Sequence, residues 1–339
     1  MPLGAGLPPD PHGLFPGQGL SPSPPPSKPP SWLFPHVVSF LLFLPIPDRN
    51  RWSEDYQDCR GTMQSPININ MANTIFSPHL RAIQLSGYSL PANEMLKLKN
   101  NGHTVVLELP QSMAITGGYA QQYRAVQLHL HWGATTGPGS EHTINGHRFS
   151  AEIHVVHYNT KYDSFKEAMV QPDGLAVLGA FLEMGPRDNP YYQELLDHMQ
   201  QIQREGEEVL VPGFNIASLL PVNLKYYYRY NGSLTTPPCY QSVRWTVFNQ
   251  TMMISRDQML MLITSLRNDD GKPLQSNYRQ TQSLHGRTVL ASFQPTFFAP
   301  KQLPAGKECV ECAQGAGMQR QGKEQELRHP VSLTSICIG

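Results

Sequence analysis

The chain has 339 residues, which is enough for one large domain or two small ones. Its 26 acidic and 26 basic residues give a formal net charge of zero, so nothing in the composition indicates nucleic acid or an anionic membrane surface as a partner. Of its 31 prolines, 14 fall within the first fifty residues, which separates this region from the rest of the chain.

The first fifty residues are expected to lie outside the folded domain. Residues 1–30 are mostly Pro, Gly and Ser, and this composition buries too little apolar surface to offset the entropy of ordering. An apolar run at residues 32–44 is too short, and too interrupted by Pro35, to span a bilayer. It fits either the hydrophobic region of a late signal peptide, preceded only by Lys28 as positive charge, or a faulty gene model. We predict a disordered segment over 1–50.

From Gln64 onward the pattern is one of strands separated by turns. Runs rich in β-branched and aromatic residues predict strands at 105–109, 125–132, 151–158, 175–182 and 243–248. The run 175–182 is apolar throughout, which suits a central strand covered on both faces. The sequence therefore favours a mainly β fold, α+β in some classifications.

Two helices are predicted at the periphery. One contains the helically spaced residues Tyr192, Leu195, Leu196, Met199 and Ile202. The other begins at Ser255, which caps it with Gln258 as capping-box partner, ahead of Met259, Leu262 and Leu266.

Beyond about residue 295 the strand pattern fades, and we predict a disordered tail over 298–339. The last apolar stretch, 331–339, is far too short for a membrane span or an anchor signal. Cys309 and Cys312 form a single CxxC without a second ligand pair, so they are interpreted as incidental cysteines and not as a zinc site.

Two of the predicted strands carry histidines in alternation. Side chains on a strand point to opposite faces in turn, so His129 and His131 share a face with Gln127, and His154 shares one with Glu152. The opposite faces are apolar and are expected to pack in the core: Val126, Leu128, Leu130 and Trp132 on one strand, Ile153 and Val155 on the other. Three neutral imidazoles with a fourth position left open are typical of a catalytic zinc site.

Seven motifs follow one another across the central region. They are QSPIN (64–68), NNGH (100–103), HLHWG (129–133), GSEHT (139–143), AEIHVVH (151–157), DGLAVLG (173–179) and SLTTPP (233–238). In their order and spacing they resemble the α-class carbonic anhydrases, most of all the extracellular and membrane-associated members, over roughly 55–295. The resemblance implies a domain at 51–297 with a large twisted, mostly antiparallel central sheet and short peripheral helices.

The resemblance also implies a function, the reversible hydration of carbon dioxide to bicarbonate and a proton by zinc-bound hydroxide. In this family His129, His131 and His154 would hold Zn²⁺, with Gln127 and Glu152 supporting the rings. The simpler interpretation of Glu152, a surface carboxylate, fits poorly with its apolar neighbours. The remaining histidines, His142, His147 and His157, are interpreted as structural, with His142 matching a family core residue and His157 facing away from His154.

The SLTTPP segment supplies further predicted roles. Thr235 matches the threonine that accepts a hydrogen bond from the zinc hydroxide and donates one to Glu141, and Thr236 would contact bicarbonate. A rigid proline turn is an equally compatible interpretation of the segment. Family members have cis bonds at the positions of Ser65–Pro66 and Pro237–Pro238. The apolar wall that receives carbon dioxide would consist of Val156, Val177, Leu234, Val243 and Trp245.

The proton that hydration produces must be transferred from the site to the solvent. His103 matches the family's shuttle histidine, although a turn histidine with no catalytic role is the alternative. Asn101 belongs to the polar lining. Val106 stands where cytosolic relatives most often carry a polar residue, and the aromatic arm that precedes Trp52 in relatives has no match here. Both differences predict slower proton transfer than in the fastest members.

The resemblance implies a Cys59–Cys239 disulfide, with two buried free thiols as the alternative, and hence an extracellular, secreted protein. Sequons at Asn231 and Asn249 agree with a glycoprotein. The expected partners are small molecules only, with no nucleic acid, no membrane span in this chain, and a monomeric or dimeric state. Two other hypotheses remain: a catalytically silent extracellular binding domain, and a non-functional product of an aberrant transcript.

Overall fold

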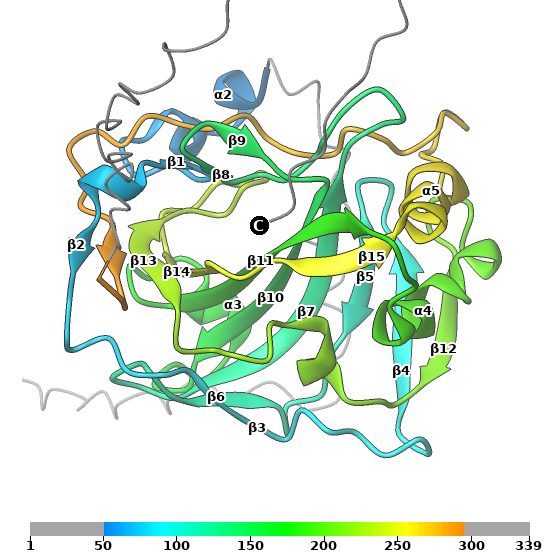
Figure 1. The fold of residues 1–339 in the computed structure, drawn as a ribbon, viewed down its shortest axis with the longest axis horizontal. Coiled ribbons are helices and arrows are strands. Elements are labelled where there is room, and N and C mark those ends of the chain that lie inside the picture. The colour runs from blue at the N-terminus through cyan, green and yellow to red at the C-terminus, as the bar shows by residue number, and fades with distance from the viewer. Residues whose placement is uncertain (1–50, 295–339) are drawn as a thin grey trace, which may run out of the picture. The chain divides into compact units, whose positions relative to one another are not determined.

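The computed structural model describes residues 51–294 (Figure 1). The predicted segments 1–50 and 298–339, the apolar run at 32–44 and the pair Cys309 and Cys312 lie outside the described residues. Within residues 51–294, no helix is long and apolar enough to cross a membrane.

A twisted sheet of 13 strands forms the framework of the domain (Figure 1). In their order across it, ten of the strands are β12 (Glu208–Pro212), β4 (Met95–Asn100), β5 (Val105–Glu108), β7 (Tyr123–Trp132), β10 (Ala151–Asn159), β11 (Leu175–Gly185), β14 (Val243–Phe248), β13 (Tyr227–Gly232), β16 (Leu290–Ala291) and β2 (Ile75–Phe76). Beside this path, β15 (Met252–Ser255) pairs with β11, and β6 (Ala114–Gly117) joins β3 (Gln84–Ser86) to β7. A second, small sheet contains β1 (Asn68–Ile69), β8 (Thr143–Ile144) and β9 (His147–Arg148).

The strand pairs are mostly antiparallel, as predicted. The exceptions in the large sheet are the parallel pairs that β11 makes with β14 and β15, and the pair of β16 with β2. All five predicted strands are present, at nearly the predicted bounds. The other eleven strands are not predicted from the sequence, because two to six residues carry too weak a period-2 signal; they are β1, β2, β3, β4, β6, β8, β9, β12, β13, β15 and β16.

The helices are short and lie around the sheet (Figure 1). They are α2 (Trp52–Asp55), α3 (Phe165–Ala168), α4 (Pro190–Leu196) and α5 (Arg256–Ser265), with 3-10 turns η3 (Gln57–Arg60), η4 (Met71–Asn73), η5 (Met199–Gln201) and η6 (Ile216–Leu219). The capping box of Ser255 and Gln258 is confirmed at the start of α5. The helix predicted over 192–202 is instead divided into α4 and η5, because the backbone leaves the α-helical hydrogen-bond pattern after Leu196.

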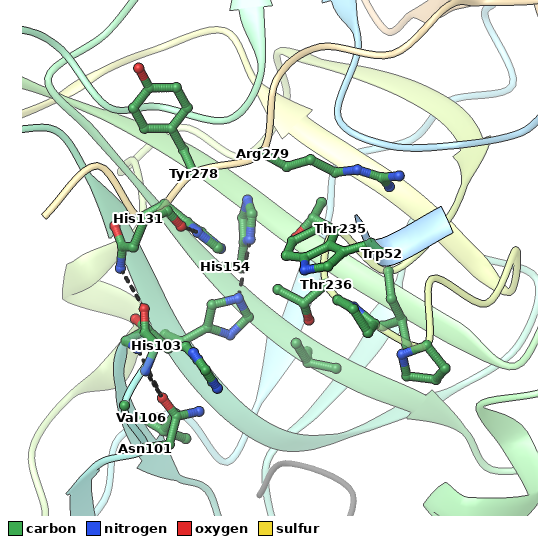
Figure 2. Close-up of a pocket in the computed structure, with 18 of the residues that line it drawn as sticks. Trp52, Asn101, His103, Val106, His131, His154, Thr235, Thr236, Tyr278 and Arg279 are labelled. Carbon is green, nitrogen blue, oxygen red and sulfur yellow. Dashed lines mark hydrogen bonds between the residues drawn. The ribbon is translucent and has the colours of Figure 1, made fainter. Parts of the chain in front are cut away.

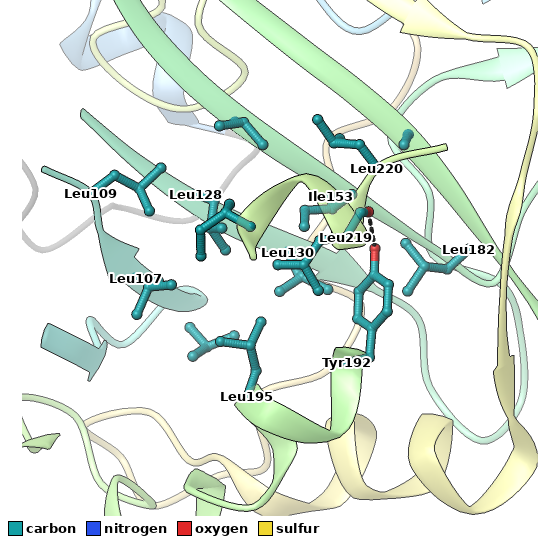
Figure 3. Packing of buried hydrophobic residues seen from close by; sticks show 14 of the residues in the cluster. Leu107, Leu109, Leu128, Leu130, Ile153, Leu182, Tyr192, Leu195, Leu219 and Leu220 are labelled. Atoms are coloured by element: carbon teal, nitrogen blue, oxygen red, sulfur yellow. Dashed lines mark hydrogen bonds between the residues drawn. The ribbon is translucent and has the colours of Figure 1, made fainter. Parts of the chain in front are cut away.

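Two hydrophobic clusters cover the central strands. The larger one, here called the main core, contains Leu128, Leu130 and Ile153 and receives Tyr192 and Leu195 from α4 (Figure 3). The smaller one, here called the pocket-side core, contains Val156, Val177, Phe181, Tyr230, Val243 and Trp245. Every residue of β10 is buried, so this strand is enclosed between the two clusters.

The predicted placement of Val126 was wrong. Val126 packs against the pocket-side core, not with Leu128 and Leu130 in the main core. The cause is an irregularity in the pairing of β7 with β10, where Val156 lies opposite Gln127 but His157 lies opposite Ala125. The extra residue Val126 falls out of alternation, as in a β-bulge.

His157 predicts how the stability of the domain changes in acid. Its ring is buried in the core, 2.6 Å from the Tyr88 hydroxyl, and burial lowers its pKa from 6.5 to about 4. Between pH 6.5 and 4, His157 is mostly protonated in the unfolded chain but mostly neutral in the folded chain. The free energy of unfolding therefore falls as the pH is lowered through this range, by up to about 3 kcal/mol from this residue.

Urea unfolding at a series of pH values, with wild type and His157→Gln compared, measures this contribution. In His157→Gln, the free energy of unfolding should depend less steeply on pH between 6.5 and 4, by the slope that corresponds to uptake of about one proton. Parallel pH profiles for the two proteins would contradict the assignment.

Candidate metal centre

Three histidine rings converge at the middle of the sheet. His129 and His131 stand two residues apart on β7, and the register of β7 with β10 puts His154 directly opposite His129. Ring centroids are 5.0 Å apart for His129 and His131, 5.2 Å for His129 and His154, and 4.7 Å for His131 and His154. One nitrogen of each ring lies within 4.8 Å of the others, so the three can reach one ion.

The second nitrogen of each ring is held by a carbonyl or carboxylate oxygen. His129 Nδ1 lies 2.9 Å from Gln127 Oε1, and His154 Nε2 lies 2.7 Å from Glu152 Oε1. His131 Nδ1 lies 2.9 Å from the backbone oxygen of Asn277. These oxygens accept hydrogen bonds, so each of these ring nitrogens is the donor and the opposite nitrogen carries a lone pair.

The lone-pair nitrogens fit a metal ion. His129 Nε2 and His154 Nδ1 are 3.3 Å apart, and among the described residues His131 Nε2 is buried with no hydrogen-bond partner. Burial, together with the neighbouring rings, holds the pKa of His129 well below its usual range, and burial also lowers the pKa of His131. The neutral imidazole, which is the form that binds metal, is therefore favoured.

Glu152 is a fully buried carboxylate with four hydrogen bonds. Oε1 accepts from His154 and from His142 Nδ1 at 2.7 Å, and Oε2 accepts from the backbone N–H groups of Glu141 and His142 at 2.8 Å. Burial alone would raise its pKa, but His142 and His154 outweigh burial and lower that pKa well below the usual range. The other ring nitrogen of His142, Nε2, lies 2.6 Å from the hydroxyl oxygen of Tyr230. His142 is therefore a buried structural residue, as predicted.

Glu141 lies beside the rings but differs in one contact from what was predicted. Its Oε1 accepts the backbone N–H of Arg279 at 2.8 Å, and its Oε2 is buried 3.9 Å from His154 Nδ1. Among residues 51–294, Oε2 has no hydrogen-bond partner, so the predicted bond from Thr235 is not formed. Both oxygens instead face the ligand rings, because Oε1 also lies 3.4 Å from His131 Nδ1.

A cavity of about 1570 Å³ opens over the three histidines. Figure 2 shows His131 and His154 with His103, Asn101 and Val106 to one side and Trp52, Thr235 and Thr236 to the other. Gln127 and four of the five predicted wall residues also border it: Val156, Val177, Leu234 and Trp245. The prediction for Val243 was wrong: its side chain is buried in the pocket-side core and does not border the cavity.

His103 stands at the edge of this cavity on a tight turn. Gly102 has φ +81°, which glycine adopts without strain, and Asn101 Oδ1 accepts the N–H groups of His103 and Thr104 at 3.0 and 2.8 Å. The backbone oxygen of His103 accepts from the side chain of Asn277 at 2.9 Å. The turn is therefore fixed, while the role of its histidine stays a prediction.

The predicted disulfide is confirmed. Cys59 and Cys239 are joined with their Cα atoms 5.0 Å apart and lie 180 residues apart in the chain. Both predicted cis bonds, Ser65–Pro66 and Pro237–Pro238, are also present. The two sequon asparagines, Asn231 and Asn249, are exposed.

Several residues at the site had no sequence signal. Asn277 contributes a backbone carbonyl and Arg279 a backbone N–H, and neither group depends on residue type. The aromatic side chains of Trp52, Phe165 and Tyr278 line the cavity, but from sequence they cannot be distinguished from core residues.

Comparisons with known proteins agree with this geometry. The family profile of the eukaryotic-type carbonic anhydrases matches residues 47–293. Carbonic anhydrase 6 of Bos taurus is 44% identical over 249 residues, which cover 73% of this chain and 78% of that protein. Carbonic anhydrase 12 of Homo sapiens is 45% identical over 251 residues, covering 72% of this chain and 70% of that protein. Carbonic anhydrase 6 of Homo sapiens is 41% identical over 261 residues, covering 76% and 84%. The chain belongs to the eukaryotic-type carbonic anhydrases and is an enzyme of that family.

Proposed function

We propose that this enzyme hydrates carbon dioxide reversibly to bicarbonate and a proton, with Zn²⁺ held by His129, His131 and His154. The observation that carries the proposal is the convergence of three ring nitrogens, within 4.8 Å of one another, beside a cavity. Carbonic anhydrases are themselves the reference case for such a zinc ion, which lowers the pKa of its water to about 7 and so supplies a nucleophile at neutral pH.

The walls of the cavity suit a small apolar substrate. Val156, Val177 and Trp245 come from three neighbouring strands and border the cavity beside the rings. Carbon dioxide has no net dipole and is held by such a surface without a cost in lost hydrogen bonds. Thr235, which lines the cavity, would orient the attacking water, and Glu141, whose Oε2 has no hydrogen-bond partner among residues 51–294, would accept a hydrogen bond from the threonine hydroxyl in the active enzyme. Thr236, which also lines the cavity, would contact the bicarbonate product.

The proton would leave through His103. Its turn borders the same cavity as the three ligand rings, and imidazole exchanges protons readily near neutral pH. Asn101, which also lines the cavity, would help to order the intervening water, whereas Val106 offers no polar group. Transfer slower than in the fastest relatives remains our proposal.

The catalytic domain is proposed to occupy residues 51–297, since the family profile matches residues 47–293. Extracellular secretion is supported by the disulfide, because such bonds persist in oxidising compartments. The exposed Asn231 and Asn249 are proposed as glycosylation sites, and a monomer or dimer as the assembly. A silent binding domain is less well supported, since a complete ligand set would have no use in it.

His129→Ala tests the ligand assignment. The variant should lose zinc and carbon dioxide hydration together, because two imidazoles hold the ion too weakly. His147→Ala is the matched control, since His147 is exposed on β9 and its ring contacts Phe149. Metal analysis and stopped-flow hydration check both proteins. Retained hydration in His129→Ala would refute the assignment.

Glu152→Gln tests the support of the ligand rings. An amide replaces one of two oxygens that each accept two hydrogen bonds, so zinc affinity should fall about 10- to 100-fold. Glu208→Gln, on exposed β12 and paired with Lys97 at 3.2 Å, should change stability by less than about 0.5 kcal/mol and leave affinity intact. Competition with a chelator measures both, and equal affinities would contradict the role of Glu152.

His103→Ala tests the proton shuttle. The variant should show a kcat reduced about tenfold or more, with kcat/KM nearly unchanged, because only proton release is affected. Added imidazole buffer should restore kcat. A variant with the wild-type kcat in dilute buffer would dismiss the shuttle.

A further inference from the structure

Three consecutive residues, 277–279, contact three separate parts of the site; they are here called the strap. The backbone oxygen of Asn277 accepts from the ligand ring of His131 at 2.9 Å, and its side-chain Nδ2 donates to the backbone oxygen of His103 at 2.9 Å. Two residues on, the backbone N–H of Arg279 donates to Glu141 Oε1 at 2.8 Å. A shift of the strap would therefore displace a ligand ring, the histidine turn and the carboxylate together.

No strand or helix includes the strap, whose neighbours from 274 to 281 also lack regular secondary structure. Its backbone is held to the end of β7 by only a few bonds, from the N–H of Ser276 to the oxygen of Gly133 at 2.9 Å and from the N–H of Asn277 to the oxygen of Trp132 at 3.2 Å, so its side chains add to its fixation. Asn277 is buried and fixes one end, since its Oδ1 accepts the N–H of Trp132 at 2.7 Å and its Nδ2 also reaches the oxygen of Leu130 at 3.3 Å. This ties the strap to the end of β7 just beyond the two ligand histidines.

Arg279 fixes the other end to the N-terminal part of the domain. Its Nη1 donates to Gln64 Oε1 at 2.8 Å and to the backbone oxygen of Ser65 at 2.9 Å, and Nη2 donates to the oxygen of Cys59 at 3.3 Å. Arg279 as a residue is 9% exposed, and its guanidinium carbon lies 5.7 Å from the ring centre of Trp52. Burying a cation this deeply is costly, so a guanidinium held by three carbonyl oxygens indicates a specific role.

The residues that bind the Arg279 guanidinium are themselves cross-linked to the segment that contains Thr235 and Thr236. Cys59 forms the disulfide with Cys239, and Gln64 Nε2 donates to the backbone oxygen of Cys239 at 3.1 Å. Cys239 N–H in turn donates to the oxygen of Thr236 at 2.9 Å. Arg279 thus links Glu141, through its backbone N–H, to Gln64 and the threonine segment, through its guanidinium.

We propose that Asn277 and Arg279 are positioning residues: Arg279 sets the carboxylate of Glu141 for the hydration step, and Asn277 sets the turn of His103 for proton release. This inference rests on the proposed function. It assigns to each side chain a different kinetic consequence, which a purely structural role for either would not produce.

Arg279→Met is the first test, with Arg287→Met as the matched control. Arg287 also holds this region, donating to the backbone oxygens of Gln64 and Asn231, but within residues 51–294 its side chain makes no hydrogen bond to Glu141 or the ligand rings. Arg279→Met should lower kcat/KM for hydration about tenfold and speed zinc release to a chelator several-fold, whereas Arg287→Met should leave both near wild type. Arg279→Lys keeps the positive charge and an N–H donor but not the planar guanidinium. Its kcat/KM and its rate of zinc release should lie between those of wild type and Arg279→Met.

Asn277→Asp is the second test. It keeps the acceptor for Trp132 N–H but faces the backbone oxygens of His103 and Leu130 with an acceptor in place of a donor. We expect kcat to fall about tenfold, imidazole buffer to restore it, and kcat/KM to change less than twofold. Asn277→Ser, which removes the amide group and its bonds to the oxygens of His103 and Leu130 without adding charge, should show the same split if Asn277→Asp folds poorly.

The outcomes separate this inference from the proposed function. A wild-type protein without bound zinc or hydration activity would overturn the proposed function itself. If wild type is active, equal losses in Arg279→Met and Arg287→Met, or parallel falls of kcat and kcat/KM in both strap variants, would show general destabilisation and overturn the positioning roles. Zinc-release rates, measured independently of turnover, decide whether the strap supports His131.

Discussion

The site depends on the register between two antiparallel strands. Because His154 pairs with His129 across β10 and β7, a residue two positions along β7 completes a triangle of rings on one face. A shift of one residue would turn His154 into the main core and present Ile153 or Val155 to the cavity. The apolar residues behind the histidines oppose such a shift, since every one of them would have to leave a packed cluster.

The same strands explain how polar groups persist deep in the sheet. Glu152 is fully buried, yet its two oxygens accept four hydrogen bonds, and two of the donors are backbone amides that no substitution of side chains removes. A carboxylate satisfied in this way can remain ionised without water and hold His154 in one tautomer. Its energetic cost is offset within the protein, so the site is prepared before any ion arrives.

The connections outside the sheet add the rest of the site. The disulfide, the two cis prolines and the strap draw together segments that begin near residue 59 and end near residue 282. None of these segments is a long strand or helix, so their mutual position relies on side-chain bonds and one covalent link. The rim of the cavity is thus formed by loop segments, whereas the ligand histidines lie on paired strands.

The sequence by itself determined the alternating strands, the histidine pairing and the capping box of α5, because side-chain period and local capping are properties of neighbouring residues. The resemblance to a known family added the disulfide, the cis bonds and most of the cavity lining. Only the tertiary structure decided the bulge that turns Val126 to the pocket side, the exclusion of Val243 from the cavity and the contacts of Glu141. It also revealed Asn277 and Arg279, since a backbone carbonyl or amide 138 to 146 residues from its partner leaves no trace in side-chain pattern.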